Sequence, residues 1–144
     1  MTDCVNQKVS RRILLIDDSI GFTHSIEGHL KLDNYECVVS NDLITGLASI
    51  LEERFDIVVV NADIPEFNDD IMNFIIINAK LNDQKIIILK SVPLLNERVK
   101  ELNENGTCYC LDKSISPQEL LHTIKSCHNF IAIPKQKINT IFTN

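Results

Sequence analysis

The 144-residue chain has little glycine and no tryptophan. Its four glycines are scattered, and neither G-x-G-x-x-G nor G-K-[ST] occurs, so a glycine-rich cradle for a nucleotide phosphate is not expected. No apolar run reaches the roughly 18 residues of a transmembrane helix, and the amino-terminus has no apolar stretch of signal-peptide length. These absences argue against nucleotide-binding enzymes and against contact with a membrane.

An excess of positive charge is also missing. Lys and Arg number 14 against 20 Asp and Glu, which gives a formal net charge of -6. A free-standing nucleic-acid binder needs a basic face, so direct contact with nucleic acid is not expected. The cysteines form an odd, scattered set of five, whereas a secreted domain would favour even pairing. We therefore expect a cytoplasmic protein.

What is present is an ordinary globular balance, with 44% hydrophobic and 24% charged residues. Short solid apolar runs alternate with stretches of helical period, which predicts five strands and five helices. The strands are expected over 13–16, 35–40, 57–61, 86–89 and 107–111, and the helices over roughly 19–33, 42–54, 71–78, 95–102 and from 117 onward. We expect one domain over 11–130, an amino-terminal extension over 1–10 and a tail over 131–144.

This alternation predicts an α/β fold of the flavodoxin-like (βα)5 type. Solid apolar strands suit a five-stranded parallel sheet in the order 2-1-3-4-5, with helices on both faces. In such a sheet, ligands bind outside the carboxyl ends of the strands, at the switch between strands 1 and 3. Polar residues end four of the predicted strands: Asp17-Asp18, Asn61 with Asp63, Lys90-Ser91 and Asp112-Lys113.

These segments resemble the receiver domain of bacterial two-component response regulators. The resemblance rests on residues 13–19, 56–65, 86–91 and 106–120, and it covers roughly 11–130. It implies that Asp17 and Asp18 match an acidic pair that holds Mg²⁺. It also implies that Lys113 matches a lysine that binds a phosphoryl group.

Other positions depart from the family pattern. The phospho-acceptor position, four residues before Pro65, is Asn61. The strand 4 hydroxyl position is Lys90, although Ser91 follows it and remains a phosphate-site equivalent. The coupled aromatic switch position is Cys110, and Ser114 replaces the proline after the lysine, for which we predict a trans peptide bond. The loss of the acceptor together with the switch pair favours a pseudo-receiver.

Asn61 has the largest chemical consequence, because an amide oxygen is a poor nucleophile for phosphorus. It also removes a charge from the metal position formed by Asp17, Asp18, Asn61 and Asp63, so Mg²⁺ binding should be weak or absent and no other cofactor is expected. Lys90 has two interpretations. It either points to solvent, or it places its ammonium among Asp17, Asp18 and Asp63 to offset their repulsion.

The leading functional hypothesis is a non-enzymatic, phosphorylation-independent signalling and protein-interaction module. One alternative is a phosphorylation-competent receiver in a phosphorelay that uses Asp17, Asp18 or Asp63 as acceptor. A less favoured one is a small flavodoxin-like enzyme or ligand binder. We expect a protein partner, or a second copy in a homodimer, on the face made by helix 4, strand 5 and helix 5, with Lys100 and Lys125 among its charges. The sequence does not tell a stand-alone domain from a fragment.

Overall fold

A computed structural model describes residues 11–91, 106 and 108–132, with side chains up to Cys127. Its five strands form one parallel sheet in the order β2-β1-β3-β4-β5, as predicted. The strands are β1 (Arg11–Ile16), β2 (Tyr35–Ser40), β3 (Ile57–Asn61), β4 (Lys85–Lys90) and β5 (Cys108–Asp112). The helices are α2 (Ile20–Leu32), α3 (Leu43–Glu52), α4 (Asp69–Asn82) and α6 (Pro117–Ala132). The expected extension over 1–10, the helix over 95–102 and the tail from 133 lie outside the described residues.

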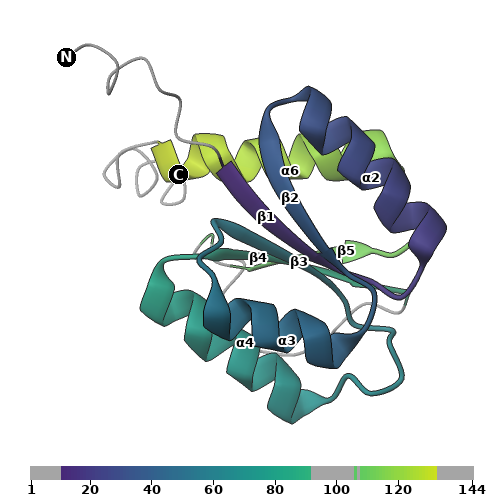
Figure 1. Ribbon diagram of the computed structural model, residues 1–144. Coiled ribbons are helices and arrows are strands. Elements are labelled where there is room, and N and C mark those ends of the chain that lie inside the picture. The colour runs from purple at the N-terminus through teal and green to yellow at the C-terminus, as the bar shows by residue number, and fades with distance from the viewer. Residues whose placement is uncertain (1–10, 92–105, 107, 133–144) are drawn as a thin grey trace, which may run out of the picture.

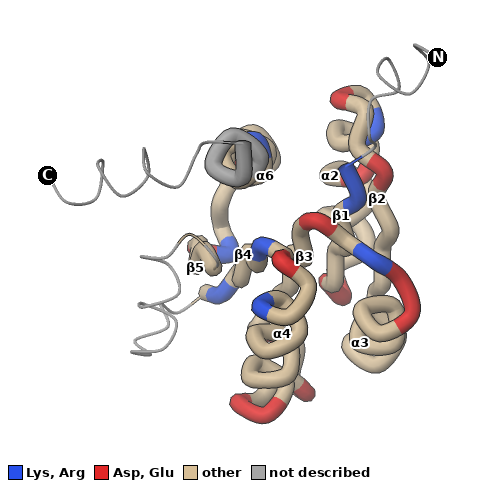
Figure 2. The backbone as a smooth tube through the Cα atoms, turned by 90° about the vertical axis from the view of Figure 1, so that its left-hand side faces the viewer, with Lys and Arg blue, Asp and Glu red and all other residues tan. Residues whose placement is uncertain are grey.

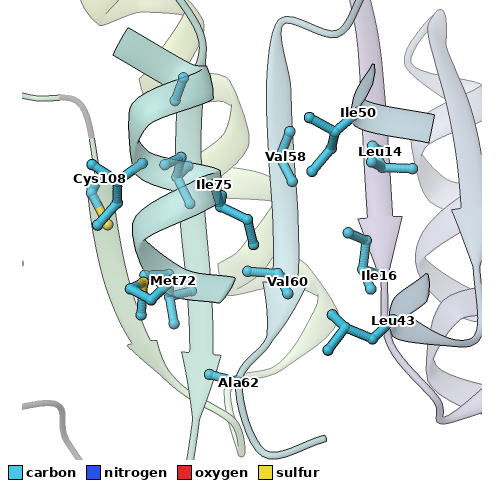
Figure 3. Packing of buried hydrophobic residues seen from close by; sticks show 14 of the residues in the cluster. Leu14, Ile16, Leu43, Ile50, Val58, Val60, Ala62, Met72, Ile75 and Cys108 are labelled. Carbon is cyan, nitrogen blue, oxygen red and sulfur yellow. The ribbon is translucent and has the colours of Figure 1, made fainter. Parts of the chain in front are cut away.

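Helices cover the sheet on both sides, with α2 and α6 on one face and α3 and α4 on the other (Figure 1). Because side chains alternate along a strand, odd and even positions enter different cores. Odd-numbered strand residues pack with α2 and α6: Ile13, Leu15, Ile57, Val59, Ile87 and Leu89. Even-numbered ones pack with α3 and α4: Leu14, Ile16, Val58, Val60, Ile86 and Ile88 (Figure 3). This parity also sets the direction in which a side chain leaves each strand end.

Side chains that cap the first turn mark where the helices begin. The side chains of Asp42 and Asn68 accept hydrogen bonds from Thr45 N and Ile71 N, which caps α3 and α4. A capping box begins α6, since Ser116 N donates to Glu119 Oε1 and Glu119 N donates to Ser116 Oγ. The expected domain boundary at 130 falls inside α6, which continues to Ala132.

Glycine is required at two places that support the site. Gly106 has a φ of 73°, the left-handed region that glycine adopts without strain, just before β5. At Gly46, a Cβ would lie 2.7 Å from the side chain of Ile16, so the absent side chain lets α3 approach β1. Both glycines therefore fix elements that carry the polar strand ends.

Candidate functional site

The polar residues that follow β1, β3, β4 and β5 meet at one edge of the sheet, because parallel strands all end there. They form two groups. We call Asp17, Asp18, Asn61 and Lys113 the acidic-pair cluster, and Asp63, Lys90 and Ser91 the Asp63 cluster. The structure thus brings the predicted site residues of these strand ends into two clusters, which a hydrogen bond from Asp63 N to Asn61 Oδ1 connects.

An ion pair between β1 and β5 forms the centre of the acidic-pair cluster. Lys113 Nζ lies 2.6 Å from Asp17 Oδ2, and the Asp17 side chain is only 1% exposed. The ammonium also sits 4.1 Å from the centroid of the Phe22 ring, on α2. A buried carboxylate is costly unless it is paired and hydrogen-bonded, and Lys113 supplies the pairing cation for Asp17 inside the fold.

Asn61 bridges the two carboxylates from the end of β3. Its Nδ2 donates to Asp17 Oδ1 over 3.2 Å and to Asp18 Oδ1 over 3.4 Å. Its Oδ1 accepts from the backbone N–H of Asp63 at 2.8 Å. These partners fix the amide orientation, because the two carboxylates need a donor and the N–H needs an acceptor. An aspartate at this position could not donate these bonds and would add a third negative charge.

Mg²⁺ does not fit this arrangement of donors and acceptors. Asp17 Oδ1 accepts from Ser19 N as well as from Asn61, and Asp17 Oδ2 accepts from Lys113. Asn61 turns its NH₂ group toward the carboxylates, and its oxygen is already bonded. Mg²⁺ requires near-octahedral oxygen ligands. An ion here would have to displace both the amide and the ammonium.

The Asp63 cluster joins the loop after β3 to the end of β4. Asp63 Oδ2 accepts from the backbone N–H of Ser91 at 2.9 Å and from its hydroxyl at 2.5 Å. Lys90 Nζ lies 3.5 Å from Asp63 Oδ1 and 3.5 Å from the carbonyl oxygen of Ala62. The hydroxyl of Ser91 is the main cause of a lowered pKa of Asp63, with help from its N–H and from Lys90. The carboxylate is thereby kept charged and attached to β4.

Lys90 therefore corrects one expectation. Its ammonium does contact a carboxylate, but this is Asp63, and the cation that reaches Asp17 is Lys113. The peptide bond between Lys113 and Ser114 is trans, as predicted, because residues 11–91, 106 and 108–132 contain no cis bond. With this trans bond, Lys113 points into the site and contacts Asp17.

Cys110 occupies the predicted switch position, where it packs as an apolar side chain. It is half-buried and packs against the α3/α4 core, on the same side as the buried Cys108. Burial raises the pKa of the Cys108 thiol to about 12, so that thiol stays protonated at neutral pH. In the described part of the chain, no three His, Cys, Asp or Glu side chains gather in a group that could hold a metal ion.

Two supporting residues were missed in the sequence. Asn41, which follows β2, donates from Nδ2 to the backbone oxygen of Asp17 at 2.9 Å and to Thr23 Oγ1 at 3.2 Å. It is the polar residue at the end of the remaining strand, so the strand-end rule could have found it. Phe22 lies on α2, and no sequence signal separates an apolar helix position in the core from a ring that faces a cation.

Comparisons with known proteins agree with this geometry. No family model matches the chain. The transcriptional regulatory protein PrrA of Mycobacterium tuberculosis is 27% identical over 117 residues, which cover 81% of this chain and 49% of that protein. The chain thus spans about half the length of the curated relatives it matches.

No helix in the described residues is long and apolar enough to cross a membrane.

Solved structures extend the likeness to the fold. A response regulator receiver domain protein from Methanospirillum hungatei has a TM-score of 0.67 and 26% identity, covering 82% of this chain and 93% of that one. The signal receiver domain of a LuxO repressor protein from Vibrio parahaemolyticus has a TM-score of 0.69 at 15% identity, covering 94% and 99%. The resemblance recognised in the sequence is confirmed.

Proposed function

We propose that this chain, a receiver domain of the response-regulator type used in two-component signalling, acts as an interaction module whose state does not depend on phosphorylation. The observation that carries the proposal is the Asn61 amide, which donates to both Asp17 and Asp18. The position that would accept a phosphoryl group is instead a neutral bridge within the fold. Such a module is not an enzyme, and we place it in the cytoplasm.

The Asp63 cluster gives independent support. A phosphoryl group on a receiver would attract donors at the ends of strands 4 and 5, as the family resemblance implies. Here the donors of Ser91 and Lys90 already bind the Asp63 carboxylate, and Lys113 already binds Asp17. Carboxylates of the fold therefore already engage these donors in the structure, which supports a site that does not depend on a phosphoryl group.

The competing function is phosphorylation of a non-standard acceptor. The contacts of the three candidate carboxylates show which of them a phosphodonor could reach. Asp17 is buried with both oxygens bonded, and both oxygens of Asp63 are bonded to Ser91 and Lys90. Asp18 is exposed, and Asn61 is its hydrogen-bond partner among the described residues. Asp18 is consequently the carboxylate that a phosphodonor could reach, and the experiment must distinguish it.

The test is incubation of the full chain with acetyl phosphate and Mg²⁺, followed by intact-mass measurement. We expect no phosphoryl adduct on the wild type. Asn61→Asp is the positive control for donor reactivity, and Asp18→Asn identifies the alternative acceptor. An adduct that forms on the wild type and disappears in Asp18→Asn would replace our proposal with the phosphorelay alternative.

The partner surface is proposed to be the edge of the sheet at β5 with its flanking helices. β5 is the edge strand of the sheet on this side, and an unpaired strand edge invites pairing. The predicted helix over 95–102, which carries Lys100, lies outside the described residues. Lys125, expected among the charges of this face, pairs through its Nζ with Asp33 at the end of α2, 3.2 Å away.

Lys125 therefore becomes a control variant. Charge reversal at Lys100 should weaken binding of a protein partner or of a second copy, measured by pull-down and by sedimentation of the full chain. Lys125→Glu breaks a contact to α2 and should leave that binding unchanged. Equal effects of the two variants would remove support for this face.

A further inference from the structure

The strand β2 forms one edge of the sheet, and no strand of the described residues pairs with its outer side. Figure 2 shows β2 and α2 at one end of the sheet and β5 at the other. The register of β2 with β1 runs without a bulge from Tyr35 to Ser40. The strand also lacks lysine and proline, two residues that commonly protect an exposed edge from pairing. Its outer side is therefore suited to pairing with a further strand.

The side chains of β2 favour such pairing. The one charged residue of the strand, Glu36, is neutralised within the chain, because its Oε2 lies 3.0 Å from Arg12 Nε. On the neighbouring strand β1, the residues from Ile13 to Ile16 are fully buried. The apolar side chains of β2 are only half-buried: Tyr35, Cys37, Val38 and Val39. A further strand would bury more of this apolar surface, which stabilises an association.

The backbone groups of β2 alternate between its two sides. Asp17 N donates to Ser40 O over 3.1 Å, so the peptide groups of Ser40 face β1. The N–H and C=O groups of successive residues point to opposite sides of a strand. Those of Tyr35, Cys37 and Val39 therefore face outward, and they are the donors and acceptors that an added strand would bind.

A second copy of β2 satisfies these outward groups best in one antiparallel register. Two residues that lie opposite each other exchange both hydrogen bonds when the backbone groups of both face the partner strand. With Cys37 opposite Cys37 of the second copy, Tyr35 lies opposite Val39, and every outward residue of β2 is bonded. Aromatic and β-branched residues such as Tyr35 and Val39 form stabilising cross-strand pairs. Glu36 then lies opposite Val38, so no like charges meet.

The helix beside β2 gives charge complementarity to the same arrangement. Glu27 and Lys31 form an ion pair on α2, with Oε2 and Nζ 3.5 Å apart. Burial is the main cause that raises the pKa of the Cys37 thiol to about 12; Glu27 also raises this pKa and Lys31 lowers it. Both charges therefore lie near Cys37, in the middle of β2. A two-fold axis at Cys37 reverses the direction of α2, so Glu27 of each copy faces Lys31 of the other.

We propose that the chain forms a symmetric homodimer through the edge of β2. The two β2 strands run antiparallel about Cys37, the sheets of both copies continue as one, and the α2 helices lie side by side. Each copy contributes the same surface, so the contact closes a dimer and does not extend into a fibre. This edge lies at the end of the sheet opposite β5, which leaves the β5 edge free for a different protein.

Charge reversal on α2 tests this dimer in the full chain. Glu27→Lys and Lys31→Glu should each raise the dissociation constant of the dimer about tenfold in sedimentation experiments, because like charges then face each other across the axis. An equimolar mixture of the two variants should recover the dimer, since each lysine meets a glutamate of the other chain. Loss of the ion pair within each chain could not give this recovery. Lys80→Glu on α4 is the control and should sediment like the wild type.

A wild type that stays monomeric at NMR concentrations, or a mixture of the two variants that stays monomeric, would overturn the proposal. Amide hydrogen exchange followed by NMR tests the register. The amide protons of Cys37 and Val39 should be protected in the dimer and lose this protection in Glu27→Lys. The amide of Val38 faces β1 and should stay protected in both. Protection of Cys37 and Val39 in a monomer would assign the edge to another segment of the same chain, and fast exchange of both in the dimer would place the interface elsewhere; either result would contradict the proposal.

Discussion

The two clusters at the carboxyl edge of the sheet use the same chemistry in different environments. In the acidic-pair cluster, a lysine meets a carboxylate that is 1% exposed, at 2.6 Å. In the Asp63 cluster, a lysine meets a carboxylate that is 29% exposed, at 3.5 Å. Buried pairs are expensive to break, whereas exposed pairs contribute little. Breaking the pair in the first cluster should therefore destabilise the fold more than breaking the pair in the second, which sets the position of one strand end.

The largest effect should come from removing the buried cation. Lys113→Met leaves Asp17 charged and buried without its partner, and we expect a loss of about 3 kcal/mol in the free energy of unfolding at pH 7. Lys90→Met, the matched change in the Asp63 cluster, should cost less than about 1 kcal/mol. Chemical denaturation measures both. Adding Asp17→Asn to Lys113→Met should recover part of the loss, and equal costs for the two lysines would refute the contrast between the clusters.

The next effect concerns the amide bridge. Asn61→Asp keeps the size of the side chain, removes both donated hydrogen bonds and adds a charge beside Asp17 and Asp18. We expect a loss of about 1–3 kcal/mol without divalent ions. Mg²⁺ should then stabilise this variant and leave the wild type unchanged, which thermal unfolding with and without Mg²⁺ would reveal. Strong stabilisation of the wild type by Mg²⁺ would show that the amide does not block the ion.

The odd or even position of a residue along its strand sets the side of the sheet to which its side chain points. This alternation explains which contacts of the site could be predicted and which were missed. The order of the sheet, the converging strand ends and the capping box followed from apolar runs and short motifs. Of the three carboxylates expected around Lys90, the structure shows a contact with Asp63, and the expectation for Asp17 and Asp18 did not consider side-chain direction. Lys90 shares its parity with Ile86 and Ile88, which face α3 and α4, whereas Lys113 continues from Leu111 toward α2 and α6.

That parity was present in the sequence once the sheet was assumed. Asp17, Asn61 and Lys113 continue the odd-numbered positions of β1, β3 and β5. Their side chains therefore lie on the same side of the sheet. The contact between Lys113 and Phe22 could not be predicted, because it depends on the distance at which α2 packs on the sheet. Similarly, the hydrogen bond from Ser91 to Asp63 depends on the path of the loop after β3.

A smaller effect should appear on acidification. The pKa of Asp63 is lowered in the folded state, so its contribution to stability is present above the unfolded value of about 4 and is lost as the pH falls through the folded pKa. Ser91→Ala removes the main cause and should raise the pKa of Asp63 toward its ordinary value, followed by NMR titration of the carboxyl carbon. An unchanged titration would mean that Ser91 does not hold Asp63.

The smallest effect is expected for Mg²⁺ binding in Lys90→Thr. Because the Lys90 ammonium lies at Asp63 rather than at Asp17, its removal should leave Mg²⁺ affinity almost unchanged in calorimetric titrations. Asn61→Asp is the comparison, and its affinity should rise clearly. A large gain in Lys90→Thr would restore the view that this lysine competes with the ion.

The most direct test of the central claim is the amide NMR spectrum of the full chain before and after addition of beryllofluoride with Mg²⁺. The account predicts that the amide signals of Asn61, Asp63, Ser91 and Lys113 stay in place in the wild type, because a neutral bridge and fixed carboxylates already satisfy the site. Saturable shifts of these four signals in the wild type would contradict it.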